Sequence, residues 1–265
     1  MNGHNRQTNS KRVLLILMWV CTIPVKGIIP FLRGWRVTNA KDYEIVKKLT
    51  LGYSMIRWGD GETANLRMKS TFHQKKNEEL AKELNNLLEK ALVEPNLMFG
   101  LPILGLRYPI LGSNQFNFPL LKIYFSTRVL FNQKRFLQFK KSPVVDQMFW
   151  YKNYHRLSEI LTILSFQERS VLFISSFDEK DFFRNCMDYT FVEVSPTDSF
   201  DNFRYLISQV SKWIENSPNR PLLLLAGGAA SKVVGARFTK NCQVIDVGSG
   251  IRFGRIGGVK FDWEE

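Results

Sequence analysis

The second half of the chain alternates short apolar runs with amphipathic segments, and this alternation restricts the fold more than any other feature. The expected strands are 170–177, 191–194, 222–225 and 244–247. The expected helices are 180–187, one capped by Ser199, and one that opens within 226–232 and runs to about Thr239. Alternation of this kind predicts an α/β fold, a Rossmann-like and mostly parallel sheet with helices on both faces.

The first half contains fewer but equally clear elements. The expected elements are a helix over 41–49 capped by Asn39, a strand over 53–58, a helix over 75–93 and a strand over 97–101. The helix over 75–93 is the clearest, because its leucines recur at three- and four-residue steps and its other face carries lysine and glutamate. We expect this helix to be scaffold and not part of a site.

The strand over 53–58 runs into Gly59-Asp60-Gly61-Glu62, which has the composition of a tight turn. Ligands of α/β sheets usually bind at such turns, beyond the carboxyl ends of the strands. In an extended chain, side chains two apart point the same way, so Asp60 and Glu62 could converge on one hard divalent cation. The alternative is an ordinary surface turn with two solvated acids. Arg57 just before the turn favours the site.

A second candidate turn follows the apolar strand 222–225. Small residues around Gly227 and Gly228 would let a phosphate approach backbone amides at a helix N-terminus. A close-packed turn between strand and helix explains these glycines equally well. Asp246, at the end of the next strand, could face the same crevice or could simply cap a loop.

Charge and cysteine content limit the partners and the compartment. The formal charge of +13 implies an anionic partner, such as a phosphate-bearing ligand, an anionic membrane or a nucleic acid. The aromatic and basic stretch 122–139 could bind nucleic acid, but no known nucleic-acid-binding pattern accompanies it, so this partner is disfavoured. Three widely spaced cysteines argue against a disulfide framework and fit a reducing, cytoplasmic location.

Residues 1–36 form a basic and apolar N-terminal segment, and 37–265 are expected to form a single catalytic domain. The apolar run 13–25 is too short to span a membrane comfortably and has basic residues on both sides. Two interpretations stay open: a helix lying in an anionic membrane interface at the inner face of the plasma membrane, or a helix packed on the core.

The segment Arg57-Trp58-Gly59-Asp60-Gly61-Glu62 resembles the Arg-Phe-Gly-Asp-Gly-Glu signature of the bacterial GT-D-fold glycosyltransferases, originally a domain of unknown function. The resemblance extends over about 38–247 and includes the Thr127-Arg128 pair. The chain departs from the family at 227–230, where the family has Gly-Pro-Thr-Ala, and at 248–249, where it has Gly-His.

The resemblance implies a GT-D-type fold and a set of roles. Asp60 and Glu62 would hold Mn²⁺ or Mg²⁺ on the donor's diphosphate. The catalytic residues would be Asp60, Glu62 and Arg57. The nucleotide-sugar-binding residues would be Gly59, Gly61, Arg128, Gly227, Gly228 and Asp246.

The expected function is that of a metal-dependent, hexosyltransferase-type glycosyltransferase. It would move a sugar from a nucleotide-sugar donor, with a UDP-sugar favoured, to a cell-surface glycan, polysaccharide, glycoprotein or lipid-linked acceptor. A general base is not identified, with Asp178 and Asp246 as candidates. Two alternatives remain: a non-catalytic module that binds polyanions or membranes, and another phosphate-handling enzyme on a Rossmann-like fold.

Overall fold

The computed structural model describes residues 40–71, 73–101, 145–146, 149–153, 157–164, 168–184, 186, 188–217, 221–248 and 251. All of them belong to one compact unit, built from Thr38–Pro102 and Lys141–Glu265. The expectations for the N-terminal segment, for its boundary with a single catalytic domain and for Arg128 lie outside the described residues and stay predictions. The predicted cap at Asn39 is wrong, because that helix begins at Asp42 and its N-cap is Lys41.

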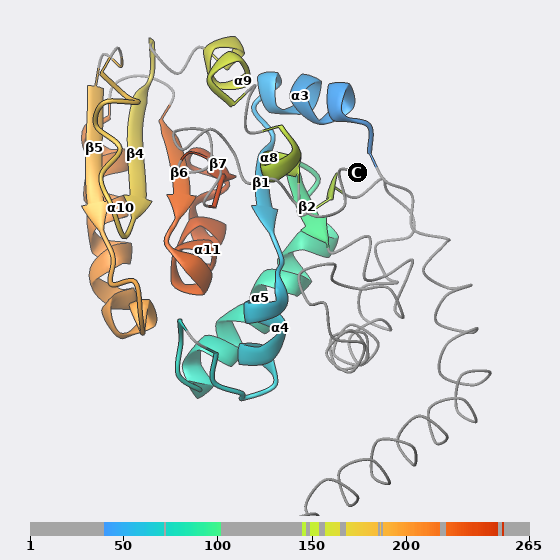
Figure 1. Ribbon diagram of the computed structural model, residues 1–265, viewed down its shortest axis with the longest axis vertical. Helices are drawn as coiled ribbons and strands as arrows, with labels where there is room; N and C mark the ends of the chain where they lie inside the picture. The colour runs from blue at the N-terminus through green and yellow to red at the C-terminus, as the bar shows by residue number, and fades with distance from the viewer. Residues whose placement is uncertain are drawn as a thin grey trace, which may run out of the picture. The chain divides into compact units, whose positions relative to one another are not determined.

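Within the residues described, seven strands form one sheet in the order β3-β2-β1-β7-β6-β4-β5 (Figure 1). The strands are β1 (Ser54–Arg57), β2 (Leu97–Leu101), β3 (Val145–Asp146), β4 (Ser170–Ser175), β5 (Asp188–Glu193), β6 (Leu222–Ala226) and β7 (Gln243–Asp246). Each neighbouring pair in this order runs parallel. The predicted α/β class with a parallel sheet is therefore confirmed.

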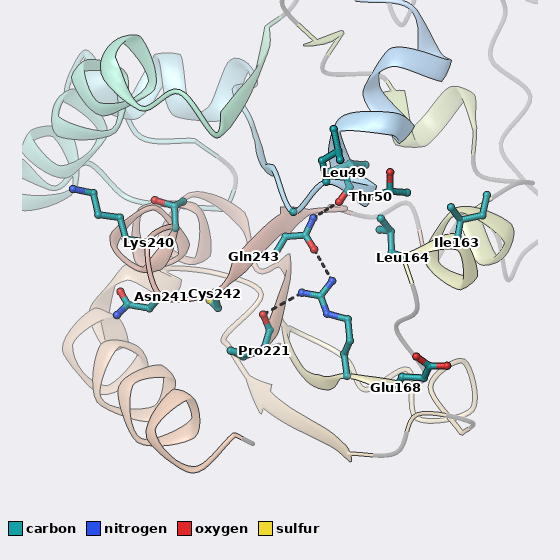
Figure 2. Close-up of a pocket in the computed structure, with 14 residues that line it drawn as sticks. Leu49, Thr50, Ile163, Leu164, Glu168, Pro221, Lys240, Asn241, Cys242 and Gln243 are labelled. Atoms are coloured by element: carbon teal, nitrogen blue, oxygen red, sulfur yellow. Dashed lines mark hydrogen bonds between the residues drawn. The ribbon is translucent and has the colours of Figure 1, made fainter. Parts of the chain in front are cut away.

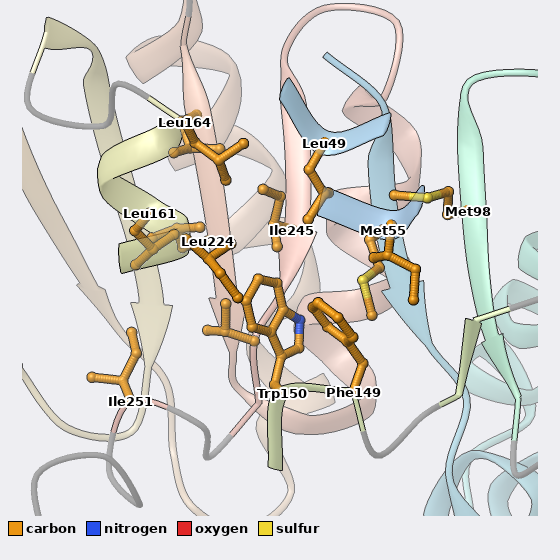
Figure 3. Close-up of a cluster of buried hydrophobic side chains, with 14 of the residues drawn as sticks. Leu49, Met55, Met98, Phe149, Trp150, Leu161, Leu164, Leu224, Ile245 and Ile251 are labelled. Carbon is orange, nitrogen blue, oxygen red and sulfur yellow. The ribbon is translucent and has the colours of Figure 1, made fainter. Parts of the chain in front are cut away.

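Helices cover both faces of this sheet. The helical elements are α3 (Asp42–Thr50), α4 (Asp60–Leu66), α5 (Glu78–Val93), α8 (Phe149–Lys152), α9 (Leu157–Ile163), the 3-10 helix η5 (Ser199–Asn202), α10 (Phe203–Asn216) and α11 (Gly228–Phe238). On one face, apolar side chains of α3, α8 and α9 pack against alternate strand residues. Figure 3 shows Leu49, Trp150 and Leu161 from these helices around Leu224 and Ile245 of the central strands.

The opposite face is covered by α11, which packs against β6, β7, α5 and α10. The fit is close at Gly235, where an added β-carbon would lie 2.6 Å from Cδ1 of Leu225 and 2.8 Å from Cγ1 of Val244. Leu225 and Leu224 point to opposite faces because successive residues of a strand alternate. Burial on both faces is therefore the physical reason for the continuous apolar run in β6.

Helix α5 confirms the leucine pattern, with Leu80, Leu84 and Leu87 buried. It begins after Asn77, whose side-chain oxygen accepts the backbone N–H of Leu80 at 3.0 Å. Such a cap stabilises a helix by about 1 kcal/mol because it pairs an otherwise unsatisfied N–H group. The helix starts three residues later than predicted, at the position of this cap.

Two expectations about helices in the second half of the chain are wrong. The helix expected over 180–187 is a series of turns at 180–184, held by bonds such as that from Phe182 N–H to the carbonyl of Glu179 at 2.8 Å. Phe183 is buried there and stacks on Tyr189 with ring centroids 4.8 Å apart, so side-chain packing sets the path of this connection. Ser199 starts the short 3-10 helix η5, and α10 follows it.

No helix within the described ranges is both long enough and apolar enough to cross a membrane.

Candidate functional site

The predicted turn at residues 59–62 is the start of a helix. Gly59 is the N-cap of α4, so Asp60 is its first residue and Glu62 its third. The backbone at 60–62 is therefore helical and not extended, so the rule for extended chains, that side chains two apart point the same way, does not apply here. A Glu three residues after the N-cap is a known helix-start signal, and it was present in the sequence.

The carboxylate of Glu62 is buried and makes two strong contacts. Its Oε2 accepts the backbone N–H of Gly59 at 2.7 Å, which satisfies one free donor at the start of α4. Its Oε1 accepts from Nζ of Lys232 in α11 at 2.6 Å, and the Glu62 side chain is only 6% exposed. Glu62 therefore joins the start of α4 to helix α11.

Arg57 and Asp246 form a second buried ion pair at the adjacent ends of β1 and β7. Nη2 of Arg57 lies 3.3 Å from Oδ1 of Asp246, and the backbone N–H of Arg57 donates to Oδ2 at 3.1 Å. Oδ1 also accepts the N–H of Gly248 at 3.0 Å. Asp246 therefore caps the loop after β7, as the simpler interpretation expected, and it also pairs with Arg57.

Lys232 connects the two pairs. Its Nζ lies 2.6 Å from Glu62 and 3.7 Å from Oδ2 of Asp246. Arg57, Glu62, Lys232 and Asp246 are hereafter called the charge network: two cations and two anions from β1, α4, α11 and β7. No role for Lys232 was predicted, because its partner Glu62 is 170 residues away and no local pattern links them.

Different physical constraints explain why the second turn has glycine at two successive positions. A β-carbon on Gly227 would lie 2.7 Å from Cγ2 of Val194 and 3.2 Å from Cβ of Ser231, so close packing explains this glycine. Gly228 has a φ of +68° and nothing within 4 Å of a would-be β-carbon, so its backbone conformation explains it and the space beside it is open. The start of α11 is thus left uncovered at Gly228.

Loops at the carboxyl end of the sheet are tied together beside this turn. Ser199 Oγ donates to the carbonyl of Gly227 at 3.4 Å, and the N–H of Phe200 donates to Oε1 of the buried Gln74 at 3.2 Å. Asp198 accepts the backbone N–H and the ammonium of Lys75, and these bonds lower the pKa of Asp198 and raise the pKa of Lys75. The segments after α4 and after β5 therefore hold each other in place.

Two other predicted residues, Gly61 and Asp178, lie outside the charge network. Gly61 lies in the first turn of α4 and has open space around it. Asp178 accepts the hydroxyl of Tyr189 at 2.7 Å, and burial together with this bond raises the pKa of Tyr189. The described contacts bring Arg57, Gly59, Glu62 and Asp246 together, and they do not bring Asp178 to that group.

A divalent metal fits poorly on Glu62 in this arrangement. Its carboxylate already accepts a hydrogen bond from the ammonium of Lys232 at 2.6 Å. A dication bound to the same oxygen would lie next to that positive charge and be repelled by it. Among the described side chains, no three His, Cys, Asp or Glu residues are grouped as a metal site. The side chain of Asp60 lies outside the described part of the chain, so its predicted metal role stays a prediction.

A cavity of about 790 Å³ lies at the other end of the sheet (Figure 2). It is lined by residues that precede the strands, among them Leu49, Arg169 and Cys242. Gln243 binds across it, donating to the carbonyls of Leu49 and Tyr53 and accepting from Arg169. No predicted site residue lines it, and ligands of parallel α/β sheets bind at the opposite, carboxyl end.

No protein-family model and no curated protein matches the sequence. Solved structures do match. A selenomethionine-substituted structure of domain of unknown function 1792 (DUF1792) superposes with a TM-score of 0.66 at 21% identity, over 87% of each chain. A structure of the same domain, described as having a distinct glycosyltransferase fold, gives 0.66 at 20% identity over 88% of this chain and 87% of that one.

A third match is a glycosyltransferase (DUF1792) from Streptococcus sanguinis, with a TM-score of 0.61 at 16% identity, over 84% of this chain and 86% of that chain. These similarities in three dimensions cover most of the chain, although the sequences have diverged widely. The chain therefore has the fold of the DUF1792 structures, a distinct glycosyltransferase fold.

Proposed function

We propose that this protein is a glycosyltransferase that moves a sugar from a nucleotide-sugar donor to the hydroxyl of a glycan acceptor. The observation that carries the proposal is the charge network: it joins the ends of β1 and β7 to the helix that follows β6, at the carboxyl edge of a sheet with a glycosyltransferase fold. That edge is where α/β sheets bind phosphate-bearing ligands.

The chemical demand of the reaction is charge stabilisation. As the bond between the sugar and the diphosphate breaks, negative charge grows on the leaving nucleoside diphosphate. The open N-terminus of α11 at Gly228 offers backbone N–H groups and the positive end of a helix dipole to that charge. Arg57 and Lys232 lie in the same region as cationic hydrogen-bond donors, each held in place by a buried carboxylate.

Asp246 acts in this proposal as a positioning residue. Its two oxygens are taken up by Arg57, Gly248 and Lys232, which fixes the Arg57 guanidinium at the end of β1. A carboxylate held in this way is poorly suited to accept the acceptor's proton, so Asp246 is set aside as the general base. A UDP-sugar is the proposed donor, and the cytoplasm is the proposed location.

The test is a donor screen on the full chain. UDP-, GDP- and CMP-sugars are each incubated with the protein, with Mn²⁺, with Mg²⁺ or with a chelator, and donor hydrolysis and nucleotide binding are measured. We expect one nucleotide class to bind and to be hydrolysed. Lys240→Ala, at the opposite end of the sheet, is the matched control and should behave as the wild type.

A result in which no nucleotide binds, while the folded protein still binds polyanions or anionic vesicles, would reject the enzyme and favour the binding module. Cleavage of a UDP- or GDP-sugar between its two phosphates, which releases a nucleoside monophosphate and a sugar phosphate in place of a nucleoside diphosphate and free sugar, would favour the third class, another phosphate-handling enzyme.

A further inference from the structure

The charge network is electrically balanced without any added ion. Two carboxylates, Glu62 and Asp246, lie beside one ammonium, with distances of 2.6 Å and 3.7 Å to Nζ of Lys232. Arg57 neutralises Asp246 from the other side. The side chains are all at most 10% exposed, so bulk water does little to screen them.

We propose that Lys232 is a built-in counter-cation that takes the place of a metal ion between Glu62 and Asp246. In this arrangement Glu62 is a positioning residue for Lys232 and not a metal ligand. The charge that a metal would supply at this point is carried permanently by the chain itself. The inference concerns the metal-binding property of the network and is tested without any nucleotide.

The geometry of Glu62 supports this assignment. One of its oxygens is bound by the N–H of Gly59 and the other by the ammonium of Lys232. A metal ligated by oxygen would need to approach within about 2.0–2.6 Å of a carboxylate oxygen. At Oε1 it would compete directly with Nζ, and at Oε2 with the backbone bond that starts helix α4.

Removing the Lys232 ammonium is expected to make the two carboxylates attractive to a metal ion. Lys232→Met keeps an apolar stem of similar length but leaves Glu62 and Asp246 with Arg57 as the remaining cation of the network. Two buried carboxylates with one counter-charge form a stronger site for a hard dication. The inference therefore predicts that loss of a positive residue creates metal affinity, which a merely structural lysine would not do.

The experiment measures Mn²⁺ binding by calorimetry, without nucleotide, for the wild type, Glu62→Gln, Lys232→Met and the double variant. We expect Glu62→Gln to bind Mn²⁺ as the wild type does, within about twofold. Lys232→Met should bind it at least about tenfold more tightly, and the double variant should lose this gain. Thermal unfolding with and without Mn²⁺ provides a second readout, because a metal that binds only the folded state raises Tm.

The inference is overturned if Glu62→Gln weakens Mn²⁺ binding tenfold or if Lys232→Met gains no affinity. Lys232→Arg serves where Lys232→Met fails to fold: it keeps the charge and should leave Mn²⁺ affinity unchanged, and a gain in this variant would also reject the inference. Because the titration contains no donor, failure here is separate from failure of the glycosyltransferase proposal, which the donor screen detects.

Discussion

A β-carbon on Gly248 would lie 1.7 Å from Nη2 of Arg57, so the two residues fit together only because Gly248 has no side chain. Gly248 also has a φ of +52°, which favours glycine. Gly248→Ala must therefore displace the Arg57 guanidinium from Asp246. We expect a loss of roughly 2–4 kcal/mol in the free energy of unfolding, from backbone strain and a disrupted buried ion pair. Denaturant unfolding measures it.

Gly228→Ala is the matched control for that variant. Gly228 has a similar φ of +68°, but nothing lies within 4 Å of an added β-carbon. It should show the cost of backbone strain alone, about 1 kcal/mol. If both variants lose the same free energy of unfolding, the close contact between Gly248 and Arg57 does not contribute to stability.

Gly227→Ala tests whether the first glycine of the second turn serves packing. The new methyl group would lie 2.7 Å from Cγ2 of Val194, so overpacking should cost about 1–3 kcal/mol. Shortening the neighbour in Gly227→Ala/Val194→Ala should recover part of that loss, as seen by chemical denaturation. If the double variant is no more stable than the sum of the single changes predicts, the contact with Val194 is not the cause.

Asp60→Asn and Glu62→Gln are expected to act differently. The sequence motif predicts that Asp60→Asn lowers activity by orders of magnitude with little change in Tm. Glu62→Gln removes a buried charge beside Lys232, so its Tm should fall by several degrees, because an unbalanced buried ion pair is costly. Transfer assays and calorimetric scans of both variants, run side by side, decide this. Two variants of equal stability would contradict the buried role of Glu62.

The described strands other than the two-residue β3, and the long helices, were predictable because local composition determines them: β6 is a run of leucines, and α5 has a cap and a leucine stripe. Helix α4 was missed because Gly59 and Gly61 resemble a turn, although Glu62 stood at the position of a capping residue. Lys232 was missed for a different reason. Its partners come from distant parts of the chain, and only the folded sheet brings them together.

The thiols provide a prediction about pH. Burial raises the pKa of Cys186 to about 11 and that of Cys242 to about 12. Since the thiolate is the reactive form, at pH 8 only about one Cys186 thiol in a thousand is reactive, and fewer at Cys242. Alkylation by iodoacetamide, followed for each cysteine by mass spectrometry, should accelerate about tenfold per pH unit between pH 7 and 10.

The raised pKa values of the two thiols also make folding stability depend on pH. A thiol whose pKa is raised by folding stabilises the folded state below its unfolded pKa of about 8.5, and that contribution declines as the pH rises towards 11. In urea both cysteines should react with an ordinary thiol pKa. A plateau of the native Cys186 rate near pH 8.5 would contradict its burial.

The N-terminal segment carries the last prediction, which rests on the sequence alone. Lys11, Arg12, Lys26 and Arg33 would each add about 1 kcal/mol of attraction near an anionic membrane surface. The full chain should therefore sediment with anionic liposomes more than a version that starts at Val37, and salt should weaken the binding. Equal sedimentation of both versions would assign the apolar run 13–25 to the core.

The position of β7 has a consequence for how the molecule is made. Of the described strands, β7 comes last in the sequence, yet it lies between β1 and β6 and joins the half made of β1, β2 and β3 to the half made of β4, β5 and β6. During synthesis the two halves emerge first, and each carries an exposed, unpaired strand edge until residues 243–246 leave the ribosome. The charge network is therefore completed late, because Asp246 arrives on the strand that joins the two halves. A nascent chain stalled before that strand would lack both a continuous sheet and the Asp246 carboxylate that pairs with Arg57. A chaperone that shields strand edges would be most useful at this stage.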